Sequence, residues 1–197
     1  KTVDDFANAS MKKWHEQVRR VFSELAETHD RVVLAGHSMG TLFSIQLALE
    51  YPEKIPFLFL LAVPLRPGIR LVTVRNLLFF VFGKLREVVP EEAATIKACG
   101  VQPTRKLWKY LKWIPSFWEL LCEMRRTEKM LGNLSVPCSA YQSRRDELVA
   151  SCTRKILEES ATMTVHNLEH SSHFYYSPDD QKRICVDFQR MIKETRG

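Results

Sequence analysis

Long hydrophobic runs are missing from this chain of 197 residues. The nearest, Phe57–Val63 and Leu77–Phe82, are far shorter than the roughly 18 to 20 apolar residues that span a bilayer. Internal repeats and low-complexity tracts are also absent. A composition of 45% hydrophobic and 26% charged residues excludes a collagen-like or wholly disordered chain. We therefore expect a soluble globular protein.

Cysteine is present, but not in a pattern that builds a framework. The five cysteines are an odd number, widely spaced and without a C-x-x-C pair, which argues against both a disulfide framework and a zinc site. The sequence therefore predicts a reducing, cytoplasmic setting and no metal. Cys122 and Cys152 lie in no motif with a paired histidine, so we expect both to be buried, unreactive thiols.

Positive charge is concentrated in one segment. The net charge is +6, and residues 66–129 hold thirteen Lys or Arg against six Glu, so the rest of the chain is nearly balanced. Basic residues surround two tryptophans there: Arg105, Lys106, Lys109 and Lys112 around Trp108 and Trp113. No nucleic-acid recognition motif accompanies them, so we expect no nucleic-acid partner. A solvated helix face and a weak contact with an anionic membrane surface remain as interpretations.

Apolar periodicity predicts helices that alternate with strands. The expected strands are residues 31–36, 57–63, 136–142 and 161–167, and the expected helices are 3–28, 41–51, 151–160 and 178–194. This alternation is typical of an α/β protein with a parallel sheet. Residues 66–132 carry no strand signal and are expected to form an inserted helical segment. The sequence thus divides into a core at 1–65, an insertion at 66–132 and a second core part at 133–197.

A pentapeptide, Gly36-His37-Ser38-Met39-Gly40, lies between the first expected strand and the helix after it. A serine raised on such a sharp turn adopts strained dihedral angles, and flanking glycines let the neighbouring backbone pass close by. The helix N-terminus that follows stabilises a developing negative charge. Ser38 is therefore the candidate nucleophile, and the backbone N–H of Met39 is a candidate oxyanion donor.

Serine needs a base to remove its proton and an acid to orient that base. Asp146 follows the third expected strand and His173 follows the fourth, so both lie at carboxyl ends of strands, where open α/β sheets hold their sites. His170 is the alternative base and Glu147 the alternative acid.

These three motifs resemble those of the α/β-hydrolase superfamily, and most of all bacterial carboxylesterases and monoacylglycerol-lipase-like serine hydrolases. The resemblance rests on Gly36–Gly40, on Arg145–Leu148 and on Ser172–Phe174. It implies an α/β-hydrolase sheet with a helical cap over residues 66–132, and a triad of Ser38, Asp146 and His173. Phe174 favours His173 over His170, because the family pattern has an aromatic or apolar residue directly after the histidine.

The implied activity is cleavage of a small-molecule carboxylic ester, of an acyl or short aliphatic acid, through an acyl-enzyme and without a cofactor. Thioesterase and lipase activities would use the same triad. A hydrolase-like module that binds a ligand without catalysis is the alternative. His37, Trp113 and Trp118 are candidate substrate-binding residues. The aromatic residues of the insertion serve either as helix packing or as a ligand wall: Phe79, Phe80, Phe82, Trp108, Trp113, Phe117 and Trp118.

The sequence departs from the family pattern in two ways. Ser143, Ser172 and Thr41 stand where the family often has glycine. Only about thirty residues precede the expected nucleophile strand, so the family's early strands and its oxyanion loop are not in this sequence. We therefore expect an upstream segment, since Val32, Val33 and Leu34 would otherwise form an apolar sheet edge.

Overall fold

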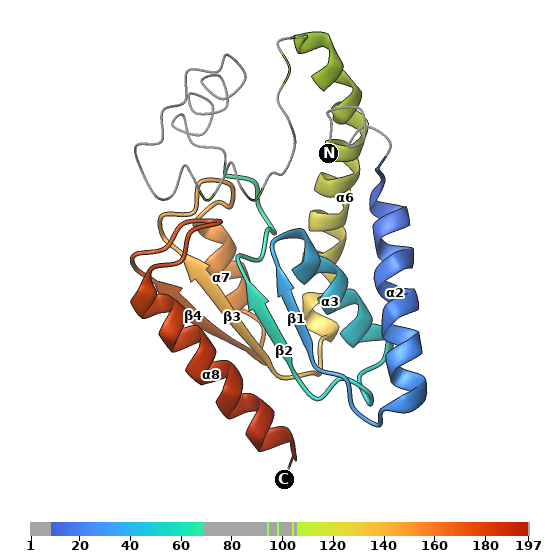
Figure 1. Cartoon of the computed structure of the whole chain (residues 1–197), viewed down its shortest axis with the longest axis vertical. Coiled ribbons are helices and arrows are strands. Elements are labelled where there is room, and N and C mark those ends of the chain that lie inside the picture. The colour runs from blue at the N-terminus through green and yellow to red at the C-terminus, as the bar shows by residue number, and fades with distance from the viewer. Residues whose placement is uncertain (1–8, 69–93, 95–97, 99–103, 105, 197) are drawn as a thin grey trace.

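The computed structural model describes residues 9–68, 94, 98, 104 and 106–196. A central sheet separates one long helix from a layer of several helices on its other face (Figure 1). The predicted α/β architecture with a parallel sheet is confirmed.

The sheet contains β1 (Leu34–His37), β2 (Leu58–Leu61), β3 (Cys138–Ser143) and β4 (Met163–Leu168), in the order β1-β2-β3-β4. Every neighbouring pair is parallel. Because parallel strands end at the same edge, residues that follow β1, β3 and β4 meet there. Within the described residues β1 pairs with β2 alone, and Ala35 on it is exposed.

Helices connect the strands and cover both faces. α2 (Met11–Thr28), α3 (Met39–Glu50), α6 (Ile114–Met130) and α7 (Cys152–Glu158) share a core with one face, and α8 (Pro178–Arg196) covers the other (Figure 1). Two short 3₁₀ helices flank α6: η1 (Leu107–Trp113) and η2 (Leu131–Asn133). The crossovers therefore bury the sheet on both sides, as a parallel sheet requires.

Successive side chains of β2 point to opposite faces of the sheet, and this explains why the protein has two hydrophobic cores. Leu58 and Leu60 pack into the larger core with α3, whereas Phe59 packs against Phe188 of α8 with ring centroids 5.0 Å apart. α3 is buried along most of its length, from Thr41 to Ala48. α3, the helix that follows the sharp turn at Ser38, is thus fixed firmly against the sheet.

The first described helix starts later than the apolar pattern predicts. α2 begins at Met11, with Ser10 as its N-cap, because the Ser10 hydroxyl accepts a hydrogen bond from the Lys13 N–H at 3.2 Å. Phe6, which the pattern included, lies outside the described residues.

Part of the predicted insertion is described. α6 packs along α3, where Gln46 Nε2 donates to Glu123 at 2.7 Å and to Thr127 at 3.0 Å. Phe79, Phe80 and Phe82 lie outside the described residues, and the division into core and cap stays a prediction.

Cysteine placement corrects one expectation. Cys122 and Cys152 are exposed, not buried, because each lies on the outer face of a helix that uses its other face for packing. Cys138 is buried in β3, and burial raises the pKa of its thiol to about 12. No helix in the described ranges combines the length and the apolar character needed to cross a membrane.

Candidate active site

A strained turn carries Ser38 from β1 into α3. Ser38 has φ 50° and ψ −126°, a conformation that is rare for a residue with a side chain. Its N–H donates to the Leu61 carbonyl at 2.9 Å, and its carbonyl accepts from the Thr41 N–H at 2.9 Å. These bonds to the neighbouring strand and the first helical turn hold the strain in place.

Only one of the two flanking glycines is required by close packing. A Cβ on Gly36 would lie 2.9 Å from the backbone N and Cα of Thr41, whereas a Cβ on Gly40 would meet nothing within 4 Å. Gly36 therefore lets α3 start close to β1. We expected both glycines to let a neighbouring backbone segment pass close by, and only Gly36 does so.

Three side chains form a continuous hydrogen-bonded chain. His173 Nε2 lies 2.9 Å from Ser38 Oγ, and His173 Nδ1 lies 2.9 Å from Oδ2 and 3.1 Å from Oδ1 of Asp146. His173 and Asp146 are 1% and 2% exposed, while Ser38 is half-buried. A hydroxyl, an imidazole and a carboxylate thus share one shielded site, and Ser38 keeps part of its surface exposed to solvent.

The Asp146 carboxylate is fixed from behind. Its Oδ1 accepts hydrogen bonds from the N–H groups of Leu148 and Val149, both at 2.8 Å. This turn aims the carboxylate at the imidazole, so the Nδ1 nitrogen of His173 carries the proton. Nε2 is then free to accept a proton from Ser38.

Two contacts to the backbone of His173 were not foreseen from the sequence. The His173 N–H donates to Glu147 Oε2 at 3.0 Å, and the His173 carbonyl accepts from His37 Nε2 at 2.9 Å. Glu147 was the alternative acid, but its carboxylate faces the backbone of the histidine and not its ring. In the sequence, His37 directly precedes Ser38 and Glu147 directly follows Asp146. This adjacency places both residues near the site, but it does not indicate which atoms they contact.

The His37 ring lies among aromatic groups. It contacts the rings of His173, Phe174 and Tyr176, at centroid separations of 5.2, 5.8 and 6.2 Å. Burial is the main cause that lowers the pKa of His37, so the neutral ring with a proton on Nε2 is favoured. Burial, together with the charges of Asp146 and Glu147, raises the pKa of the Tyr176 hydroxyl.

The backbone N–H of Met39 opens α3 directly after Ser38. N–H groups in a first helical turn have no partner within the helix, so this one is available to an oxyanion formed at Ser38. The role of Met39 as an oxyanion donor stays a prediction.

The other residues of the sequence prediction lie elsewhere. His170 is exposed, and its N–H donates to Asp180 at 3.3 Å. Ser143 donates to the carbonyl of Ser171, and Ser172 accepts from the Tyr175 N–H at 3.3 Å. The serines that replace the family's usual glycines thus brace the loop that carries His173.

The two tryptophans predicted to bind substrate lie at the end of η1 and in α6. Trp113 packs against Tyr110 and Phe117, with ring centroids 5.0 and 6.3 Å apart. Trp118 is 63% exposed and lines a groove of about 310 Å³ between α2 and α6, with Met11 and His15 opposite. Their role in substrate binding stays a prediction.

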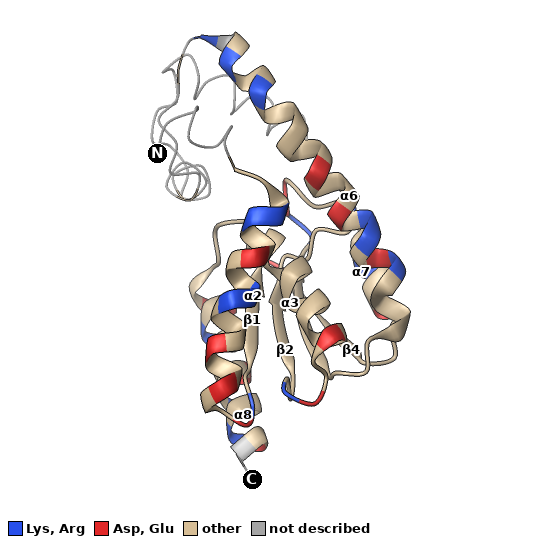
Figure 2. Cartoon of the chain, turned by 90° about the vertical axis from the view of Figure 1, so that its right-hand side faces the viewer, with Lys and Arg blue, Asp and Glu red and all other residues tan. Residues whose placement is uncertain are grey.

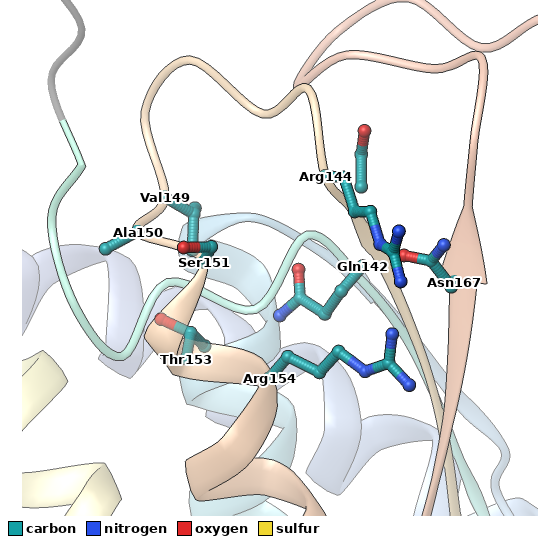
Figure 3. A pocket seen from close by; sticks show the side chains of 9 residues that line it. Gln142, Arg144, Val149, Ala150, Ser151, Thr153, Arg154 and Asn167 are labelled. Carbon is teal, nitrogen blue, oxygen red and sulfur yellow. The ribbon is translucent and has the colours of Figure 1, made fainter.

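A second, smaller cavity opens where β3 ends (Figure 3). Its volume is about 30 Å³, and polar side chains from three elements line it: Gln142, Arg144, Thr153, Arg154 and Asn167. Such a space holds about one water molecule. It is therefore too small to receive an ester substrate.

Comparison with known proteins gives the fold a context. No family model matches the chain, and no curated protein matches it in sequence. Among solved structures, a metagenome-derived lipolytic enzyme superposes with a TM-score of 0.67 at 18% identity, covering 98% of this chain and 77% of that one. A monoacylglycerol lipase of Paleococcus ferrophilus gives 0.63 at 15% identity, covering 94% and 76%.

A third solved structure, an α/β-superfamily hydrolase of Oenococcus oeni PSU-1, superposes with a TM-score of 0.58 at 15% identity, covering 95% of this chain and 75% of that one. The likenesses extend over nearly the whole chain. The chain therefore has the fold of the α/β hydrolases, as the motifs around Ser38 and His173 predict.

Proposed function

We propose that the protein is a serine hydrolase that cleaves carboxylic esters. One observation carries the proposal: His173 joins Ser38 and Asp146 through two hydrogen bonds of 2.9 Å, at a serine with φ 50°. Backbone strain of this kind persists where surrounding contacts hold the residue in place, and strained residues cluster at active sites. The resemblance to esterases and lipases in fold supports the same conclusion.

In the first step, Ser38 Oγ attacks the ester carbonyl carbon while its proton passes to His173 Nε2. The Asp146 carboxylate accepts a hydrogen bond from the His173 Nδ1–H group and stabilises the imidazolium that forms, without taking the proton. The carbonyl oxygen becomes an oxyanion, which the Met39 N–H and the start of α3 stabilise. The C–O bond to the alcohol then breaks, and the alcohol leaves with the proton from His173.

In the second step, water replaces the alcohol. His173 removes a proton from this water, whose oxygen attacks the acyl carbon and displaces Ser38. Ser38 regains its proton from His173, and the acid is released. One water is consumed and one ester bond is cleaved, so the reaction needs no cofactor.

Esters of acyl chains are the favoured substrates. The lipolytic enzyme and the monoacylglycerol lipase that share the fold support an ester with an acyl chain as substrate. A series of nitrophenyl esters of increasing acyl length, set beside matched thioesters, would distinguish esterase, lipase and thioesterase activity. We expect oxygen esters to be the better substrates.

Paired variants test the proposal. Ser38→Ala and His173→Ala should each reduce kcat/KM by at least about 10³-fold. Ser44→Ala and His170→Ala are the matched controls, because Ser44 bonds within α3 to the Gly40 carbonyl and His170 is exposed. Loss of activity in both controls and retention in both triad variants would contradict the proposal. Saturable binding of esters without turnover would indicate the ligand-binding module instead.

A further inference from the structure

Exposed apolar side chains gather at one end of the molecule. The described residues include eight large hydrophobic side chains that are exposed, and five of them lie between residues 108 and 118. Trp108 and Leu111 are 64% exposed, Ile114 is 59%, Phe117 is 51% and Trp118 is 63%. Soluble surfaces carry such residues singly, so a group of this size marks an interaction surface.

The spacing places them along one face. Steps of three residues connect Trp108, Leu111 and Ile114 through η1, and residues three apart in a 3₁₀ helix are eclipsed. Steps of three and four continue from Ile114 to Phe117 and Trp118 in α6. We call the residues 108, 111, 114, 117 and 118 the apolar stripe.

Along the sequence of the stripe, basic residues alternate with the apolar ones and acidic residues are missing. Lys106, Lys109 and Lys112 fall between its members, and residues 104–118 contain no Asp or Glu. The first acid, Glu119, uses its carboxylate to cap α2 through the Met11 N–H at 2.8 Å. The blue segments that precede α6, at the end of the molecule distant from the sheet, show this one-sided charge (Figure 2).

The combination selects one class of partner. Trp and Leu enter the interface between headgroups and acyl chains, while Lys extends its ammonium group to anionic headgroups. A nucleic acid would satisfy the lysines but leave Leu111 and Ile114 exposed. We propose that the apolar stripe and its three lysines dock the protein on the surface of an anionic phospholipid bilayer.

This docking does not depend on the proposed hydrolase activity, so the two can fail separately. Binding of the full chain is measured by flotation with vesicles of phosphatidylcholine, with and without about 30% phosphatidylglycerol. A soluble short-chain ester reports activity in the same samples. Binding is expected only with the anionic vesicles, and it should weaken as salt rises.

Two sets of variants separate charge from apolar contact. The triple variant Lys106→Glu, Lys109→Glu and Lys112→Glu should bind anionic vesicles about 100-fold more weakly, because each lysine contributes roughly fivefold near such a surface. Trp108→Ser with Leu111→Ser should weaken binding about tenfold or more. The matched controls are Lys182→Glu with Lys193→Glu, and Val21→Ser with Leu25→Ser, which change exposed residues on α8 and α2.

Controls that bind as the wild type, together with unchanged circular dichroism of every variant, would assign the loss to the stripe. Equal binding to neutral and anionic vesicles, or stripe variants that bind as tightly as the controls, would overturn the proposal. Binding of a single-stranded RNA in preference to anionic vesicles would also overturn it. The lysine variants change only exposed or half-buried positions, so they keep the test valid even if the Trp108 and Leu111 variant unfolds.

Discussion

His37 Nε2 lies 2.9 Å from the carbonyl oxygen of His173. The residue directly before Ser38 therefore holds the backbone of His173, across 136 positions of sequence. The Glu147 carboxylate holds the His173 N–H from the other side at 3.0 Å. Both polar groups of the His173 backbone are thus held by side chains: His37 at the end of β1 and Glu147 directly after Asp146.

We expect His37 to position His173 and not to take part in proton transfer. His37→Phe keeps a ring beside Phe174 and Tyr176 but removes the donor, so kcat should fall about fivefold to tenfold with little change in KM. His37→Gln keeps an N–H donor and should recover most of the rate. Steady-state kinetics on a soluble ester would measure both. Equal loss in the two variants would contradict the hydrogen-bond account.

Asp146→Asn should reduce kcat by about 10⁴-fold while leaving the fold intact. Asn keeps an Oδ1 acceptor for the Leu148 and Val149 N–H groups, so the turn survives. Its amide then donates to His173 Nδ1, which places the imidazole proton on Nε2 and blocks acceptance from Ser38. Activity and thermal unfolding together check this. A variant with native activity would show that Asp146 does not set the tautomer.

Alanine substitution should change the stability differently at Gly36 and at Gly40, the two glycines that flank the turn at Ser38. Gly36→Ala places a Cβ 2.9 Å from the Thr41 backbone and should lower the free energy of unfolding by about 1–3 kcal/mol. Gly40→Ala meets nothing within 4 Å and lies inside α3, so it should be neutral or stabilising by up to about 1 kcal/mol. Urea unfolding of both variants measures the difference, and equal destabilisation would refute the close approach.

The stability of the protein should fall as the pH falls below about 6.5. Burial is the main cause that lowers the pKa of His15, His37 and His166 from the ordinary histidine value of about 6.5. The unfolded chain therefore binds more protons than the folded chain just below pH 6.5, so acid favours unfolding. The stability is fully present above pH 6.5 and is lost as the pH falls through the folded pKa values.

His15→Phe should flatten part of this pH dependence. The His15 ring packs against Phe43 at 5.5 Å, and its Nε2 is buried without a hydrogen-bond partner among the described residues. Phenylalanine keeps the ring contact and cannot be protonated. Tm measured between pH 5 and pH 8 should vary less in the variant. An identical slope in both proteins would show that His15 does not contribute.

Local patterns carried enough information to predict the parallel sheet and to bring Ser38, Asp146 and His173 to one edge of it. The apolar run at 57–63 became β2, buried on both faces, because a parallel sheet between two helical layers needs no polar face. Asp146 and His173 were predicted as site residues because each follows a parallel strand, and the carboxyl ends of β1, β3 and β4 lie at the same edge of the sheet. Strand order and direction thus convert positions in the sequence into neighbours.

Contacts between loops could not be predicted in the same way. The bonds from His37 and Glu147 to the His173 backbone depend on loop conformations that no periodicity describes. The exposure of Cys122 depends on which face of α6 meets α2 and α3, and a helix that carries large apolar residues outside its packed face leaves this open. Tertiary packing decides such cases.

Covalent labelling tests the central claim, that Ser38 is an activated nucleophile. The full chain is treated with a fluorophosphonate, digested and analysed by mass spectrometry to locate the adduct. The account predicts a single adduct on Ser38, absent in Ser38→Ala, strongly reduced in His173→Ala and retained in Ser44→Ala. An adduct on another serine, or labelling of Ser38 that proceeds equally well in His173→Ala, would contradict it.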